Sequence, residues 1–187
     1  WGFSATVSDD GEFLIINGSQ GTDVRNRVFY KDLATADSNV LPLIEDLVAA
    51  YDFVGNHGSV LYFLSDDGAE RNRLLAIDTA HPGKDHWQTV IAENDALLLQ
   101  VSHVHGQFIA NYLRDARSQV KMFDAAGKEL RSITLPGLGT ANGFEGAVED
   151  KETFFAFGSW ALPDSVYRFD ATSGETTLFK TPSVKFD

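Results

Sequence analysis

The sequence lacks several features that would point to common functions. Its 187 residues include no cysteine, which excludes disulfides, thiolate zinc sites and cysteine nucleophiles. Basic residues are few, 15 against 27 acidic ones, and the formal net charge of −12 disfavours nucleic acid or anionic membrane as partners. No apolar run is long enough to span a bilayer, and Trp1–Val7 has neither the basic nor the apolar part of a signal peptide. We therefore expect a soluble piece of a longer protein, whose compartment, cytoplasmic or periplasmic, the sequence leaves open.

A repeat of constant length runs through the chain. Four similar segments close on aspartates that lie 46 residues apart, at Asp32, Asp78, Asp124 and Asp170. The residue four positions before each aspartate is always aliphatic. A fixed period of this length indicates stacked supersecondary units.

Each repeat contains four short apolar runs, rich in aromatic and β-branched residues and bounded by Gly, Asp, Asn or Pro. For the second repeat we predict strands at Val48–Val54, Val60–Leu64, Arg73–Asp78 and Trp87–Ile91. The best helical candidate, Leu41–Tyr51, is rejected because Pro42 and the repeat register oppose it. The chain is therefore predicted to be an all-β propeller of four four-stranded antiparallel blades, at about 1–46, 47–94, 95–138 and 139–182.

An ordered series of short motifs resembles the propeller of the prolyl oligopeptidase family, the prolyl endopeptidases among the serine peptidases. It begins with Trp1, Ala5 and Val7-Ser8-Asp9-Asp10-Gly11, and continues with Gly21, Asp23, Asn26-Arg27, Tyr30 and Asp32-Leu33. It then includes Tyr51-Asp52-Phe53-Val54, Asn72-Arg73-Leu74, Ile77-Asp78, Pro82, Trp87, Leu135-Pro136, Phe154-Phe155, Phe157, Ser159, Pro163 and Tyr167. The resemblance runs nearly from end to end, with similar spacing.

The resemblance implies that these are the last four blades of a seven-bladed propeller that covers an α/β-hydrolase domain. The family's catalytic serine, aspartate and histidine would lie beyond Asp187, with residues 183–187 beginning the linker to that domain. By resemblance, the propeller restricts entry to short peptides, which the family cleaves after proline. We therefore expect no catalytic residue, no metal and no cofactor in this chain, and expect the hydrolase domain and short proline-containing peptides as partners.

Two residues are candidates for the substrate cavity. Thr22 occupies the position where many family members carry a cysteine that faces the cavity, and Gly2 would lie beside it. The resemblance therefore implies that Thr22 and Gly2 line the outer part of the substrate site. An ordinary loop threonine is the alternative for Thr22. Threonine in place of cysteine would remove thiol-based sensitivity there.

Other motifs are better explained by structure. Asn17–Gly21 lacks the first glycine of a nucleophile elbow, and we expect it to be a loop between strands. His103 and His105 could suit a metal on one strand face, but the repeat places His105 in a turn. The acidic pairs are too few in oxygen ligands for calcium and are read as solvated turns; they are Asp9-Asp10, Asp66-Asp67 and Glu149-Asp150. The closing aspartates are predicted to bond turn amides.

Two other function classes remain. One is a stand-alone propeller that binds a ligand or protein partner. The other is a glycosidase, which would need paired carboxylates on inner strands, where only Asp52 and Glu145 occur. Four blades from a seven-bladed ring leave two blade faces uncovered, and the four blades could close as a tighter ring or pair with a second copy. We expect the isolated chain to associate with itself, most simply as a dimer.

Overall fold

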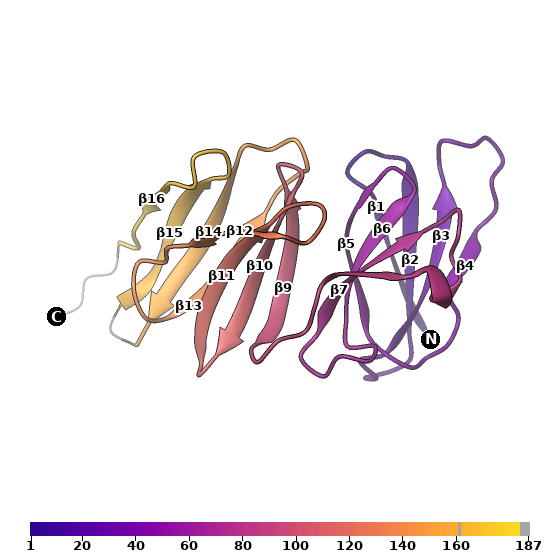
Figure 1. The fold of residues 1–187 in the computed structure, drawn as a ribbon, viewed down its shortest axis with the longest axis horizontal. Coiled ribbons are helices and arrows are strands. Elements are labelled where there is room, and N and C mark those ends of the chain that lie inside the picture. The colour runs from indigo at the N-terminus through magenta and orange to yellow at the C-terminus, as the bar shows by residue number, and fades with distance from the viewer. Residues whose placement is uncertain (161, 184–187) are drawn as a thin grey trace. The chain divides into compact units, whose positions relative to one another are not determined.

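The computed structural model describes residues 1–160 and 162–183, so most of the expected linker at 183–187 lies outside the described residues. The chain divides into two compact units, Trp1–Glu93 and Asn94–Asp187, and Figure 1 shows each as paired β-sheets. Within the described part the only helical element is a short 3-10 turn, Lys84–His86. None of the described helices is long and apolar enough to cross a membrane.

The first unit contains two four-stranded sheets whose strands follow one another in chain order. The strands are β1 (Gly2–Val7), β2 (Phe13–Ser19), β3 (Asn26–Asp32), β4 (Leu41–Ile44), β5 (Tyr51–His57), β6 (Val60–Ser65), β7 (Arg73–Asp78) and β8 (Gln88–Ile91). All pairings are antiparallel, as short connections between neighbouring strands require. One core, which includes Ile15, Val28, Tyr51, Phe63 and Ile77, joins both sheets.

The second unit repeats this arrangement, again with antiparallel strands in chain order. The strands are β9 (Leu97–Val104), β10 (Gln107–Arg114), β11 (Arg117–Phe123), β12 (Glu129–Ile133), β13 (Thr140–Glu145), β14 (Glu152–Ser159), β15 (Leu162–Asp170) and β16 (Thr176–Lys180). Its core includes Val104, Met122, Phe144, Phe155 and Phe169. The predicted all-β fold of four four-stranded antiparallel sheets is confirmed.

The closing aspartates behave as predicted, because each accepts amide hydrogen bonds from the turn that follows its strand. Asp32 Oδ1 accepts from the N–H of Ala34 at 2.8 Å, and Asp170 Oδ1 from the N–H of Thr172 at 2.9 Å. Asp78 and Asp124 accept equivalent bonds from the residues two positions on. These bonds satisfy turn amides that strand pairing leaves unpaired.

Asn26 joins the two sheets of the first unit. Its side-chain Nδ2 donates to the carbonyl of Tyr51 at 2.9 Å, and its Oδ1 accepts from the Tyr51 N–H at 2.7 Å. The Asn26 N–H donates to the Ala49 carbonyl at 3.1 Å. The Asn26 side-chain amide therefore binds the backbone of Tyr51 as a neighbouring strand would. It does so between two sheets that are not joined by strand pairing.

One strand boundary and one coverage expectation were wrong. The inner strand of the second sheet is Tyr51–His57, not Val48–Val54, since the bonds from Asn26 to Ala49 and Tyr51 hold the preceding residues in a loop. The turn expected at residues 56–58 is accordingly formed by Gly58 and the next residue. The apolar first strands of the repeats were expected to be covered on both faces, but all six residues of β1 are exposed. Most residues of β16 are also exposed, as expected for a last strand at the outer edge of its sheet.

Candidate functional site

The candidate site in the first unit lies at the end of the sheets where β2 leads into β3. Gly2 pairs with Ser19, the last residue of β2, and the connecting residues 20–25 carry Thr22. Both Gly2 and Thr22 are exposed. The antiparallel register therefore places the two candidate residues at the same end of the first sheet.

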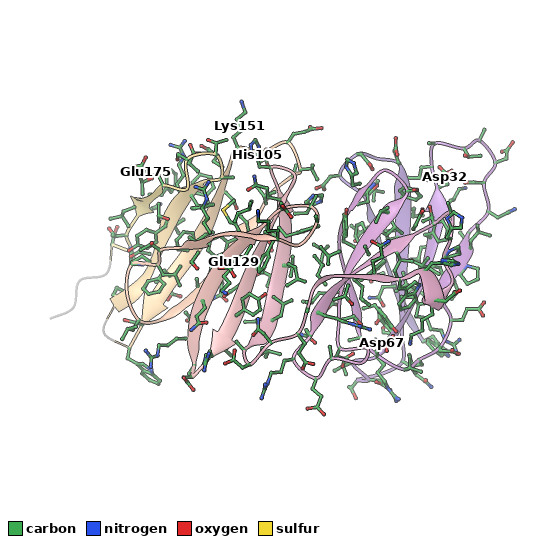
Figure 2. All side chains as sticks on the ribbon, viewed as in Figure 1. Asp32, Asp67, His105, Glu129, Lys151 and Glu175 are labelled. Atoms are coloured by element: carbon green, nitrogen blue, oxygen red, sulfur yellow. The ribbon has the colours of Figure 1, made fainter. Side chains whose placement is uncertain are left out.

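This end differs from the end that carries the closing aspartates. Figure 2 shows Asp32 and Asp67 at opposite ends of the first unit, and Asp67 belongs to the connection from β6 to β7, which is equivalent to the one that carries Thr22. Thr22 and the Asp67 connection therefore share one end, and Asp32 lies at the other.

The Thr22 connection is held by its own charges. Asp23 and Arg25 form an ion pair of 2.6 Å, and the Arg25 N–H also donates to Asp23 Oδ1 at 3.0 Å. The hydrogen bonds from Arg25 lower the pKa of Asp23 to about 2, so the carboxylate is ionised throughout the neutral range. No hydrogen bond from the Thr22 side chain to a described residue is present, so its hydroxyl is available at the tip.

An aromatic ring and a cation lie at the same end. The Arg27 guanidinium sits 4.8 Å from the centroid of the Trp1 ring, and Arg27 Nε is buried without a hydrogen-bond partner among the described residues. Trp1 itself is 57 % exposed. Cation–π contact orders the indole while leaving much of its surface open to a ligand.

A hydrogen-bonded network of Tyr51, Asp67 and Lys84 lies at the same end of the first unit. Tyr51 donates its hydroxyl to Asp67 at 2.8 Å, and Lys84 Nζ pairs with the same carboxylate at 2.6 Å. Burial, followed by the hydrogen bond to Asp67, raises the pKa of Tyr51. The tyrosine therefore stays neutral and donates its hydrogen bond to Asp67.

The structure also places the motifs that the sequence analysis explained by structure, Asn17–Gly21 and the two histidines His103 and His105. Asn17 to Ser19 continue β2 instead of forming the expected loop, because β1 and β3 pair with them on both sides; only residues 20–21 leave the strand. No strand-to-helix turn exists there, so the nucleophile-elbow reading fails. His103 is buried in β9 and stacks on Phe108 at 4.8 Å, while His105 lies in the turn with a φ of 55°.

Metal and glycosidase chemistry find no support in the described residues. No group of three or more His, Cys, Asp or Glu side chains there could hold a metal ion. Among the described inner strands, each unit contributes one carboxylate, Asp52 on β5 and Glu145 on β13. A single carboxylate per unit offers no acid–base pair within either one.

A concave surface in the second unit escaped the sequence prediction. A cavity of about 630 Å³ is lined by residues in and beside three connections, among them Arg117 at the start of β11, Leu138 and Trp160. Trp160 is fully exposed and Leu138 is 73 % exposed. The only sequence signal was a glycine pair flanking Leu138, which alone did not indicate a site.

The comparisons with known proteins assign the class. Sheets of four antiparallel strands in chain order, repeated four times, define a β-propeller chain, and a solved prolyl endopeptidase structure matches 99 % of this chain with a TM-score of 0.91 and 28 % identity. Residues 1–182 match the family model described as prolyl oligopeptidase, N-terminal beta-propeller domain. The chain belongs to that family.

Curated relatives agree. The chain is 31 % identical over 183 residues to a prolyl endopeptidase of Elizabethkingia meningoseptica, and 32 % identical over 184 residues to one of Elizabethkingia miricola. Each alignment covers 98 % of this chain and 26 % of the relative. The chain therefore spans about a quarter of the length of these relatives.

Proposed function

We propose that this chain is the substrate-gating part of the propeller of a proline-specific serine endopeptidase that hydrolyses short peptides. The observation that carries the proposal is the family match over residues 1–182, together with relatives above 30 % identity that are named prolyl endopeptidases. Hydrolysis would be performed by the α/β-hydrolase domain of that enzyme, and we assign no catalytic residue to these 187 residues.

Within this function, Thr22 and Gly2 line the outer part of the substrate cavity. Both residues lie at one end of the first sheet, and the connection that carries Thr22 is held by the Asp23–Arg25 ion pair; these positions support the assignment. An ordered connection presents a fixed surface to an incoming peptide and loses little entropy when the peptide arrives.

The test uses the full-length polypeptide that contains this chain. Thr22→Cys introduces a thiol into a segment of 187 residues that has none. If Thr22 lines the cavity, alkylation of Thr22→Cys with N-ethylmaleimide inhibits cleavage of a proline-containing peptide, and saturating peptide slows that inhibition. The unsubstituted enzyme, treated identically, corrects for any cysteine elsewhere in the polypeptide.

The matched control is Thr35→Cys. Thr35 follows β3 at the opposite end of the same sheet and is also exposed. Equal inhibition of both variants would refute the assignment of Thr22 to the cavity. Absence of proline-specific cleavage by the unsubstituted polypeptide would instead favour the stand-alone binding module.

The isolated 187-residue chain also associates with itself in this proposal, most simply as a dimer. The support is apolar surface on two strands at the edges of their sheets: Phe3 on β1 is 69 % exposed, and Phe179 on β16 is 63 % exposed. Each exposed ring costs roughly 25 cal/mol per Å² in water, which pairing of such faces recovers. Light scattering should give a dimer mass that falls to the monomer mass in Phe3→Glu/Phe179→Glu. Val40→Glu, in an exposed connection, should leave the mass unchanged, and a monomeric unsubstituted chain would refute the proposal.

A further inference from the structure

The chain contains two Asn-Gly pairs, Asn17-Gly18 and Asn142-Gly143. Such a pair can lose ammonia without an enzyme, because a glycine has no side chain to shield its nitrogen from the amide carbon of the preceding asparagine. The nitrogen attacks that carbon and closes a cyclic imide, a succinimide, which water then opens. The surrounding structure decides whether the attack can occur, and it differs between the two pairs.

The first pair is protected by strand pairing on both sides. Gly18 of β2 pairs with Phe3 on β1 and with Arg27 on β3. It is buried, and ring atoms of Phe3 and Phe29 lie 3.3 and 3.7 Å from the position that a Cβ would take. Attack on the Asn17 side chain therefore requires local opening of the three paired strands.

The second pair lies at the edge of a sheet. Asn142-Gly143 belongs to β13, which pairs only with β14. Asn142 is exposed, and no hydrogen bond from its side chain to a described residue is present. The ladder shifts register directly after this pair, between Gly143 and Glu145. The side-chain amide and the following peptide can therefore turn toward each other with few contacts to break.

The nitrogen of Gly143 faces the unpaired edge of β13. Ala141 turns its backbone away from β14, since its N–H donates to Ser118 Oγ at 2.9 Å and its carbonyl accepts from Asn111 Nδ2 at 2.8 Å. Backbone groups alternate along a strand, so the Asn142 carbonyl points toward β14 and the N–H across its trans peptide bond points away. No hydrogen bond from the Gly143 N–H to a described residue outside β14 is present, so none restrains the nitrogen.

This edge of β13 also joins the two sheets of the second unit. Gln100 Nε2, on β9, donates to the Gly143 carbonyl at 2.9 Å. The next residue, Phe144, is 1 % exposed and stacks on Phe155 with ring centroids 4.5 Å apart. An additional backbone atom before Gly143 would displace both contacts, because interior packing leaves little space to absorb it.

We propose that Asn142 is a site of spontaneous deamidation, which loosens the joint between the two sheets of the second unit. The Gly143 nitrogen forms a bond to Asn142 Cγ, its proton leaves with the side-chain amino group, and ammonia is released. Water then opens the succinimide. Attack at the side-chain carbonyl gives aspartate, and attack at the backbone carbonyl gives isoaspartate, whose backbone contains one additional carbon.

Isoaspartate is the product that loosens the joint. The additional carbon shifts Gly143 and Phe144 along β14, and a shift of register moves side chains off the face that they pack on. Aspartate adds a charge at an exposed position and leaves the backbone length unchanged. The two products therefore differ in their effect on the fold.

The first test compares the two pairs in one chain. The 187-residue chain is incubated in mildly alkaline water enriched in heavy oxygen, folded in one sample and unfolded in urea in another. Mass spectrometry of digested samples measures conversion at each asparagine, and heavy oxygen in the new carboxyl group identifies ring opening during the incubation. In the folded chain Asn142 should convert about tenfold or more faster than Asn17, since β2 must open first. In urea the two rates should agree within about twofold, because the strands that protect Asn17 are then absent.

The second test follows the consequence with matched variants. Glutamine would have to form a larger ring, so Asn142→Gln and Asn17→Gln each block conversion at their own site. After incubation, amide hydrogen exchange at β13 and β14 should be faster in the unsubstituted chain and in Asn17→Gln, and unchanged in Asn142→Gln. Asn142→Asp, which has the charge and a backbone of normal length, should exchange like the fresh unsubstituted chain.

Three results would overturn the proposal. One is equal conversion of Asn142 and Asn17 in the folded chain. Another is unchanged exchange at β13 and β14 after Asn142 has converted. The last is an Asn142→Asp chain that exchanges as fast as the converted chain, which would assign the loosening to charge and exclude the role of isoaspartate.

Discussion

The amide of Asn26 is the point where the fold can be tested most sharply. Asn26 is 4 % exposed, and its side chain satisfies both the N–H and the carbonyl of Tyr51, which is 1 % exposed. We predict that Asn26→Ala lowers the free energy of unfolding of the first unit by about 2–4 kcal/mol. Each buried backbone group left without a partner costs about 1–3 kcal/mol, and water entering the vacated space recovers part of that cost.

Urea denaturation followed by tryptophan emission measures this loss. Trp87 packs edge-on against Tyr51, with ring centroids 6.0 Å apart, so its emission reports on the affected region. Asn17→Ala is the matched control, because Asn17 lies in β2 and its side chain has no hydrogen bond to a described residue. We expect a control loss of about 1 kcal/mol or less. A loss for Asn26→Ala within about 0.5 kcal/mol of the control would refute the role of the amide.

Three further outcomes follow from local geometry. Ala116→Gly should stabilise the second unit by about 0.5–1 kcal/mol in urea, because glycine adopts a φ of 57° without strain; a destabilised variant would contradict this. Gly139→Ala should destabilise it by about 2–3 kcal/mol, since the new methyl collides with the Gly158 carbonyl, and unchanged stability would exclude that close approach. Hydrogen bonds from Thr172 and then Ser173 lower the pKa of Asp170, so Asp170→Asn should lower the free energy of unfolding at neutral pH. The difference in free energy of unfolding between this variant and the unsubstituted chain should shrink as the pH falls below 3.8, because Asp170 is then protonated in the unfolded chain. A difference that does not change with pH would count against these hydrogen bonds.

The repeat could be predicted from sequence because its determinants are local. Asp32 and Asp170 bind amides two or three residues further on, so the pattern that ends each third strand is contained within one turn. The start of β5 could not be placed in the same way. Ala49 and Ala50 continue an apolar run, yet Asn26 and Asp66 capture their backbone groups in a loop, and those partners lie far off in sequence.

The two sites also differ in how far the sequence could predict them. Thr22 and Gly2 were candidates only through resemblance, and the register of β1 against β2 then brought them to one end of a sheet. The cavity of the second unit combines Arg117 at the start of β11 with Leu138 and Trp160 from two connections. No periodicity links residues at such spacings, because the sheet packing alone makes them neighbours.

The order of the strands has a consequence for how the chain folds. In all four sheets each strand pairs only with the strand before or after it, so every ladder closes over a short loop. Closing short loops costs little entropy, and chains rich in local contacts fold faster than β proteins whose pairings span the whole sequence. Each sheet can therefore form as soon as its own segment leaves the ribosome, with Asn26 docking the first sheet onto the second only once Tyr51 has been synthesised.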